Sequence, residues 1–161
     1  MDYAEILVSL RRIIRAVNLE GKRLEKEHGV SIPQLLCLSF LEQKEGYRAT
    51  LSEIKNYLKL NASTVTGITT RLEKRGLIAR LPTDDKDRRV NYITLTRKGG
   101  ELVQQMPDIL HVQLINKLAQ SSPEKLDELR SAFQVIIGFL EIEDIDASPI
   151  LASNENIATT R

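Results

Sequence analysis

The chain has 161 residues, of which 42% are hydrophobic and 28% charged, a composition that fits one globular domain and excludes wholesale disorder. No apolar run approaches the roughly 18 residues of a membrane span, and the first residues place acids before apolar side chains without a cleavage site, so we expect no membrane partner and no signal peptide. The formal net charge is only +1, and the single cysteine, Cys37, excludes an internal disulfide and fits the cytoplasm.

The first predicted element is a helix over about residues 3–28. Its apolar residues recur mostly at steps of three and four between basic ones, and Gly29 suits a left-handed stop. The motif "SIPQ" at 31–34 then has the form of a capping box and opens a strongly apolar helix, which we expect to be buried on most sides. This helix contains Cys37, for which a buried inert thiol is favoured over a redox sensor.

A second capping box, "TLSE" at 50–53, predicts a short helix. Asn61 can cap the next helix, which Arg75 and Gly76 are expected to end. The segments "LIARL" and "VNYITL" follow, each rich in β-branched or aromatic residues, on either side of six consecutive charged residues at 84–89. This pattern predicts a β-hairpin with a charged tip.

Thr96 is expected to cap a long helix that continues to about residue 119 with a kink at Pro107. Ser122 and Pro123 open a last helix. That helix carries a seam typical of coiled coils, formed by Leu126, Leu129, Phe133, Ile136 and Leu140. From about residue 144 the chain has no period and many small polar residues, so we expect a mobile tail unless a partner holds it.

The charge is unevenly distributed along the chain. Residues 51–100 hold eleven basic and five acidic residues, a net charge of +6, whereas residues 101–161 hold four basic and ten acidic residues, a net charge of −6. Residues 1–50 hold eight basic and seven acidic residues, a net charge of +1. A basic middle segment suggests a polyanionic partner.

Two short helices joined by a tight turn and followed by a hairpin predict a mainly α fold of the winged helix-turn-helix type, whose second helix would read double-stranded DNA. In that helix Val65, Ile68 and Leu72 are expected to face the core. Thr is a poor helix former, so four threonines at 64, 66, 69 and 70 favour a DNA-reading face over an ordinary solvated one. The candidate DNA-binding residues of this helix are Ser63, Thr64, Thr66, Gly67, Thr70, Arg71 and Lys74.

The segment from residue 51 to 99 resembles the DNA-binding core of the MarR family of bacterial transcription regulators. The resemblance rests on "STVT…RLEKRGLI.R" and on the wing pattern D-x-x-D-R-R-x-x-x-x-x-L-T-x-x-G, which begins at Asp84 and ends at Gly99. It implies that Arg89 enters the minor groove, that Asp87 orients it, and that Arg88 makes a phosphate or second groove contact. Many members have an acid immediately before the recognition-helix arginine, where this chain has Thr70.

The resemblance also implies a division into four segments: a dimerisation helix (1–30), the winged DNA-binding domain (31–100), C-terminal dimerisation helices (101–143) and a tail (144–161). A homodimer would then bind a pseudo-palindromic operator as a repressor of transcription. A small aromatic effector would bind between the dimerisation helices and the winged domain. A monomeric helical subdomain is the alternative to the dimer. The apolar helical seam favours the dimer.

Other classes of function have little support in the residues. The two histidines and Cys37 lack metal-ligand spacing, and we expect no metal and no cofactor. No Gly-rich phosphate loop, nucleophile elbow or pair of carboxylates at a suitable spacing occurs, so we expect no enzyme. The remaining alternative to a DNA-binding regulator is a winged helix that docks an acidic protein through its basic face.

Overall fold

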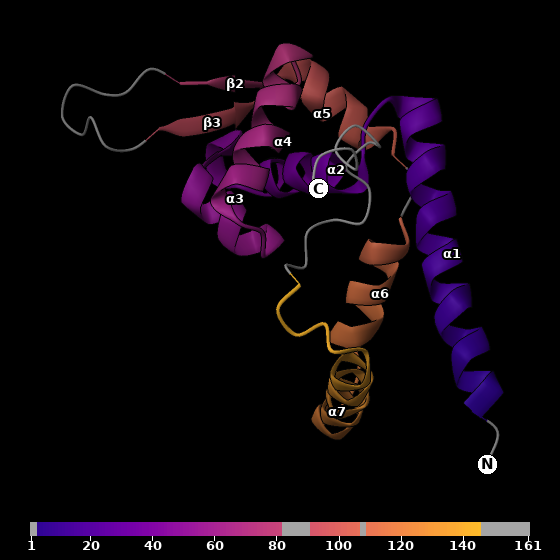
Figure 1. Ribbon diagram of the computed structural model, residues 1–161. Coiled ribbons are helices and arrows are strands. Elements are labelled where there is room, and N and C mark those ends of the chain that lie inside the picture. Colours follow the sequence, from indigo (N-terminus) through magenta and orange to yellow (C-terminus); the bar gives the residue numbers. More distant parts are fainter. Residues whose placement is uncertain (1–2, 82–90, 107–108, 146–161) are drawn as a thin grey trace, which may run out of the picture. The chain divides into compact units, whose positions relative to one another are not determined.

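The computed structural model describes residues 3–81, 91–106 and 109–145 (Figure 1). The chain divides into two compact units, one reaching to Met106 and the other beginning at Pro107. Within the described ranges, none of the helices combines the length and the hydropathy that crossing a bilayer requires.

The first unit contains helices, a short 3-10 turn and three strands. In chain order these are α1 (Tyr3–His28), α2 (Ile32–Glu42), η1 (Glu45–Tyr47), β1 (Arg48–Thr50), α3 (Leu51–Leu58), α4 (Ala62–Lys74), β2 (Ile78–Arg80), β3 (Tyr92–Leu95) and α5 (Arg97–Gln104). Helix α2 contacts α3, α4, α5 and β3, and it is therefore the centre of the unit. Its buried residues confirm the prediction for this helix and include Leu35, Cys37, Leu38 and Leu41.

Side chains at the predicted caps begin these helices. The Glu53 backbone N–H donates to Thr50 Oγ1 at 3.2 Å, and the Thr50 N–H donates to the Glu53 carboxylate at 2.8 Å, so the box is complete. Hydrogen bonds from the Thr50 backbone and then its side chain hold the pKa of Glu53 below its ordinary value. The Thr64 N–H donates to Asn61 Oδ1 at 2.8 Å, and the Gly99 N–H to Thr96 Oγ1 at 3.1 Å.

The predicted helix stops are also confirmed. Gly29 and Gly76 have φ of +68° and +69°, in the left-handed region that glycine adopts without steric cost. Helix α3 ends differently, because its C-cap is Lys59 with φ of 55°, a left-handed residue that bears a side chain. No glycine marks this end, so the sequence carries no signal for its left-handed conformation.

The three strands form one antiparallel sheet in the order β1-β3-β2. The predicted hairpin is confirmed by the pairing of β2 with β3, in which Ile78 lies opposite Leu95. Strand β1 was not predicted, because three residues are too few for a period-2 pattern to be recognised. It forms only because β3 offers a partner, with Arg48 opposite Thr94.

The predicted long helix after Thr96 is wrong. Helix α5 ends at Gln104, and a separate helix, α6 (Leu110–Ala119), begins six residues later. A proline lacks the N–H of the helical ladder, and it disfavours the α conformation of the residue before it. Near Pro107 these effects end the helix instead of kinking it.

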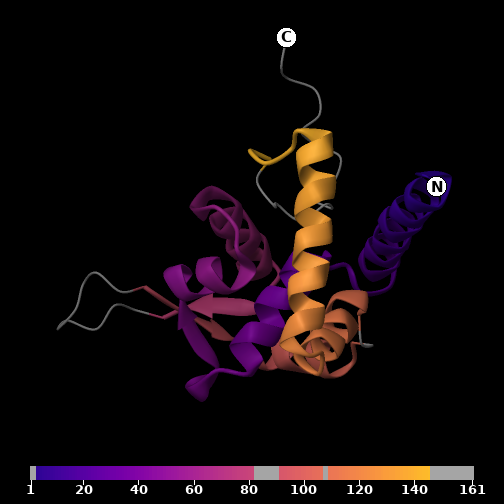
Figure 2. The ribbon, with the colours of Figure 1, turned by 90° about the horizontal axis from the view of Figure 1, so that it is seen from below.

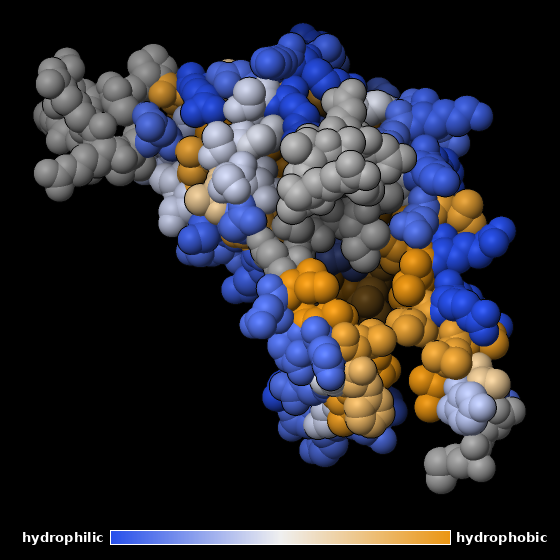
Figure 3. Space-filling view, viewed as in Figure 1, coloured by the Kyte–Doolittle hydropathy of each residue, from blue (hydrophilic) through white to orange (hydrophobic). Residues whose placement is uncertain are grey.

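The second unit consists of α6 and α7 (Pro123–Leu140), and Figure 2 shows α7 as one uninterrupted helix. Ser122 caps α7 with Pro123 in its first turn, as predicted. None of the residues of α7 is buried in the single chain: Phe133 is 52% exposed and Phe139 84%. Of the predicted seam, Phe133 and Leu140 are exposed, whereas Leu126, Leu129 and Ile136 are half-buried. Figure 3 shows orange, hydrophobic surface on this unit.

Helix α1 has a similar excess of exposed apolar surface. Gly21 and Leu24 near its C-terminal end are buried, whereas Ile6 and Ile13 are more than half exposed. Figure 3 shows this apolar surface along the N-terminal part of α1. Of the predicted tail, residues 146–161 lie outside the described residues.

Candidate nucleic-acid interface

Helices α3 and α4 form a helix-turn-helix. Lys59, Leu60 and Asn61 connect them, and Leu60 is buried. The left-handed Lys59 reverses the chain, and the side chain of Asn61 then starts α4. A three-residue turn of this kind is typical of DNA-binding helix pairs.

One side of α4 anchors it in the core. Val65, Ile68 and Leu72 are buried, as predicted. Thr69 is also fully buried, and its hydroxyl donates to the Val65 carbonyl at 3.0 Å. Its position therefore has a structural reason, so of the four threonines Thr69 cannot contribute to a reading surface.

The other side of α4 carries all seven candidate residues. At 100° per residue they lie within one arc of the helix, opposite the buried arc. Four of them are exposed, and Thr64, Gly67 and Thr70 are half-buried. The exposed four are Ser63, Thr66, Arg71 and Lys74.

Two hydroxyl groups of this surface already donate their protons within the protein. Thr66 Oγ1 donates to the Ala62 carbonyl at 2.8 Å, and Ser63 Oγ donates to Asn61 Oδ1 at 2.7 Å. Each of these oxygens keeps lone pairs that can accept a hydrogen bond. Such acceptors match the exocyclic amino groups that cytosine and adenine present in the major groove.

An ion pair joins α4 to the base of the hairpin. Arg80 Nε of β2 lies 3.0 Å from the Glu73 carboxylate of α4. Glu73 is thereby neutralised beside the cationic surface. Thr70 is half-buried on the same helix and has no carboxylate at the position where many MarR members have an acid. In this chain, Glu73 supplies the carboxylate of α4 that contacts the hairpin strand.

The predicted wing-tip residues Asp87, Arg88 and Arg89 lie outside the described residues. The described part of the hairpin ends with the Leu81 N–H donating to the Tyr92 carbonyl at 2.9 Å. The roles of these three residues stay predictions.

Two further cations lie on the helix-turn-helix and were not singled out in the sequence. Lys55 and Lys59 on and after α3 are exposed, and neither forms an ion pair with another described residue. In the sequence they contribute only to the excess of basic residues over 51–100, and that excess does not single out individual positions.

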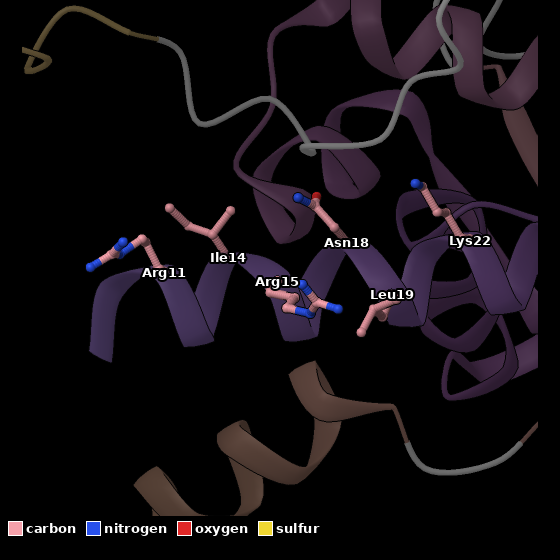
Figure 4. A pocket seen from close by; sticks show the side chains of 6 residues that line it. All are labelled: Arg11, Ile14, Arg15, Asn18, Leu19 and Lys22. Carbon is pink, nitrogen blue, oxygen red and sulfur yellow. The ribbon is translucent and has the colours of Figure 1, made fainter. Parts of the chain in front are cut away.

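A hollow lies along α1, where basic and apolar side chains alternate (Figure 4). The lining residues in the described part of the chain all belong to this one helix. They are Arg11, Ile14, Arg15, Asn18, Leu19 and Lys22.

Cys37 is buried in α2, and desolvation raises the pKa of its thiol to about 12. At pH 8 we expect labelling by an aromatic disulfide reagent to be on the order of 1,000-fold slower in the native protein than in the unfolded protein, because the thiolate reacts and an ordinary thiol has a pKa near 8.5. Release of the reagent's chromophore would be followed with and without denaturant. Comparable rates in the two states would contradict the buried, inert thiol.

Within the described ranges, no cluster of His, Cys, Asp and Glu side chains is arranged to hold a metal ion.

A helix-turn-helix followed by an antiparallel hairpin defines the winged helix-turn-helix class. The model of the MarR family matches residues 30–90, which include all of α2 to β2. Transcriptional repressor MprA of Escherichia coli K12 is 31% identical over 137 residues, covering 79% of this chain and 74% of the relative. The organic hydroperoxide resistance transcriptional regulator of Bacillus subtilis is 30% identical over 123 residues, covering 76% and 80%. The chain belongs to the MarR family of transcription regulators, as the motifs indicated.

Solved structures agree with this fold. The MarR family regulator Sco3205 of Streptomyces coelicolor, in complex with DNA, has a TM-score of 0.59 at 22% identity, covering 91% of this chain and 94% of that one. The complex of MepR from S. aureus with DNA has the same TM-score at 21% identity, covering 87% and 99%. Identities this low show the fold alone.

Proposed function

We propose that this chain is a sequence-specific DNA-binding repressor of transcription, which acts in the cytoplasm as a homodimer on a pseudo-palindromic operator. The observation that carries the proposal is the outward side of α4, where small hydroxyl side chains lie beside Arg71 and Lys74 on a helix anchored by its opposite side. Relatives named as repressors, and relatives of the same fold solved with DNA, support it.

In this proposal α4 enters the major groove and the hairpin tip enters the adjacent minor groove. Acceptor hydroxyls and close backbone approach supply sequence discrimination, and lysines and arginines supply affinity through phosphates. The residues proposed to contact DNA are Ser63, Thr64, Thr66, Gly67, Thr70, Arg71, Lys74, Arg88 and Arg89, with Asp87 orienting Arg89. Lys55 and Lys59 are proposed as further phosphate contacts.

The homodimer is proposed from uncovered apolar surface. Helix α7 has no buried residue, and Phe133, Val135 and Leu140 are each more than half exposed. Apolar surface of this extent on a helix is typical of an interface. We assign residues 1–30 and 101–143 to dimerisation and residues 31–100 to DNA binding, and a two-fold dimer would present its two α4 helices to half-sites about 34–36 Å apart.

A small aromatic effector is part of the same proposal. The hollow on α1 suits an anionic aromatic molecule, because Arg11, Arg15 and Lys22 offer positive charge beside Ile14 and Leu19. Displacement of operator by aromatic carboxylates in a binding titration would test this part separately.

The proposal is tested by selecting bound duplexes from a random pool. Recovery of an inverted repeat would support both sequence-specific reading and two-fold symmetry. Equal enrichment of every duplex would overturn the sequence-specific version. The alternative function is a winged helix that docks an acidic protein through its basic face. It predicts that no specific duplex is enriched and that an acidic protein partner is bound instead.

On the selected operator, Arg89→Ala is expected to weaken binding by about 10- to 100-fold, because a groove-inserted arginine contributes about 1–3 kcal/mol. Fluorescence anisotropy would measure affinity, and light scattering would show that the dimer is intact. Arg97→Ala is the matched control, since Arg97 is 93% exposed, pairs with Glu101 on α5 and is not among the proposed DNA contacts. Wild-type affinity in the Arg89 variant would remove the wing from the mechanism.

A further inference from the structure

Arg75, at the C-terminal end of α4, contacts the C-terminal end of α1. Its Nη2 donates to the His28 carbonyl at 3.3 Å, and its Nη1 donates to the Gly29 carbonyl. These residues are separated by 46 and 47 positions along the chain but lie in the same compact unit. One guanidinium therefore bridges the ends of two helices.

The end of α1 is shaped to accept this guanidinium. Carbonyls at a helix C-terminus lack partners within the helix and form the negative end of its dipole, so they attract a cation. A Cβ on Gly29 would lie 2.9 Å from Arg75 Nη2, closer than real Cβ atoms approach a neighbour. The glycine thus serves both the left-handed turn and the close approach of Arg75.

A second hydrogen bond connects Arg75 to helix α5. Lys98 Nζ of α5 donates to the Arg75 carbonyl at 2.9 Å. The Arg75 N–H itself donates to the Arg71 carbonyl, which makes Arg75 the C-cap of α4. Arg75 therefore joins the recognition helix to the end of α1 and to the start of α5.

We infer that Arg75 is a positioning residue that sets the angle between α1 and the recognition helix α4, and thereby the half-site spacing that the dimer accepts. This inference rests on the proposed function, in which α1 contributes to the dimer interface. Helix α1 has 26 residues and is roughly 39 Å long. A rotation of about 5° at its Arg75 end therefore moves its far end by about 3 Å, which is close to the rise of one base pair.

The experiment compares wild type with Arg75→Ala on the selected operator and on duplexes whose half-sites are one base pair closer or farther apart. Wild type is expected to prefer its own spacing at least tenfold, whereas Arg75→Ala is expected to lower that preference to about threefold or less. The matched control is Arg97→Ala, which removes one nearby charge from α5 at a side chain that is 93% exposed. It is expected to keep the wild-type preference.

Salt dependence separates positioning from a direct phosphate contact by Arg75. A positioning role leaves the slope of log K against log salt unchanged in Arg75→Ala. Loss of a phosphate contact would lower the slope by about 0.9 and weaken binding equally at all three spacings. That result would overturn the inference.

A measurement without DNA tests the contact between Arg75 and the end of α1 separately from the proposed function. Amide hydrogen exchange in residues 25–31 is expected to rise at least fivefold in Arg75→Ala and to stay at the wild-type rate in Arg97→Ala. Unchanged exchange in Arg75→Ala would show that the contact does not hold α1 in solution and would overturn the inference. Absence of any specific duplex for wild type would instead overturn the proposed function, and the exchange result would still decide the role of Arg75.

Discussion

Gly99→Ala is expected to lower the free energy of unfolding by about 3 kcal/mol, whereas Gly100→Ala is expected to raise it by about 0.5–1 kcal/mol. A Cβ at Gly99 would lie 2.1 Å from the Leu77 carbonyl oxygen and 2.8 Å from Leu95 Cδ1. The first of these is backbone, so α5 itself must shift. Gly100 lies in the same helix as Gly99, and a Cβ there would meet only Leu95 Cδ2 of β3 at 3.8 Å, an ordinary van der Waals contact.

The effect at Gly99 is large because its neighbours are fixed. The Thr96 N–H donates to the Leu77 carbonyl at 3.1 Å, and Thr96 Oγ1 donates to the Gly76 carbonyl at 2.7 Å. Moving α5 away would break these bonds, which join it to the end of the α4–β2 turn. Urea denaturation of the two variants and wild type would measure the difference. Equal stability of the two alanine variants would contradict the close approach of α5 to Leu77.

Gly67→Glu is expected to weaken operator binding by more than about 100-fold without lowering the stability of the fold. Gly67 lies in the middle of the outward side of α4, where a Cβ would meet only the Arg71 guanidinium, at 3.4 Å. Glutamate favours a helix more than glycine does, and it can pair with Arg71 four residues later. In the complex, however, its bulk and negative charge would face the bases and phosphates of the major groove.

Two variants make this prediction specific. Gly100→Glu adds the same side chain to α5 and is expected to retain wild-type affinity, which excludes a general effect of net charge. Gly67→Ala is expected to bind within about tenfold of wild type, since it adds only a methyl group. Affinity would be measured by anisotropy and stability by thermal unfolding. Wild-type affinity of Gly67→Glu would remove α4 from the DNA interface and favour the protein-docking alternative.

Local elements of this fold were predictable because their signals are local. A capping side chain such as Thr50 or Asn61 reaches only two or three residues along the chain, and a left-handed glycine such as Gly29 acts at one position. The inward side of α4 followed from helical periodicity, and Val65 and Leu72 are buried accordingly. The class of fold and the family followed from the order of such elements.

Features that need a distant partner were missed or misjudged. Strand β1 exists because β3 provides its hydrogen bonds, and Thr69 belongs to the core although threonine suggested a reading residue. Helix α5 ends at Gln104, well before the predicted end at about residue 119, so the effect of Pro107 on the helix was underestimated.

The sequence by itself determined the helix boundaries set by caps, the apolar side of each short helix, the hairpin and the MarR family of this chain. Only the tertiary structure decided which polar residues of α4 face outward, that Glu73 joins α4 to the hairpin, and that Arg75 joins α4 to the end of α1. The physical reason is the distance along the chain over which each interaction acts. Capping and periodicity act within one or two helical turns, whereas a guanidinium finds carbonyls 46 residues away only after the chain has folded.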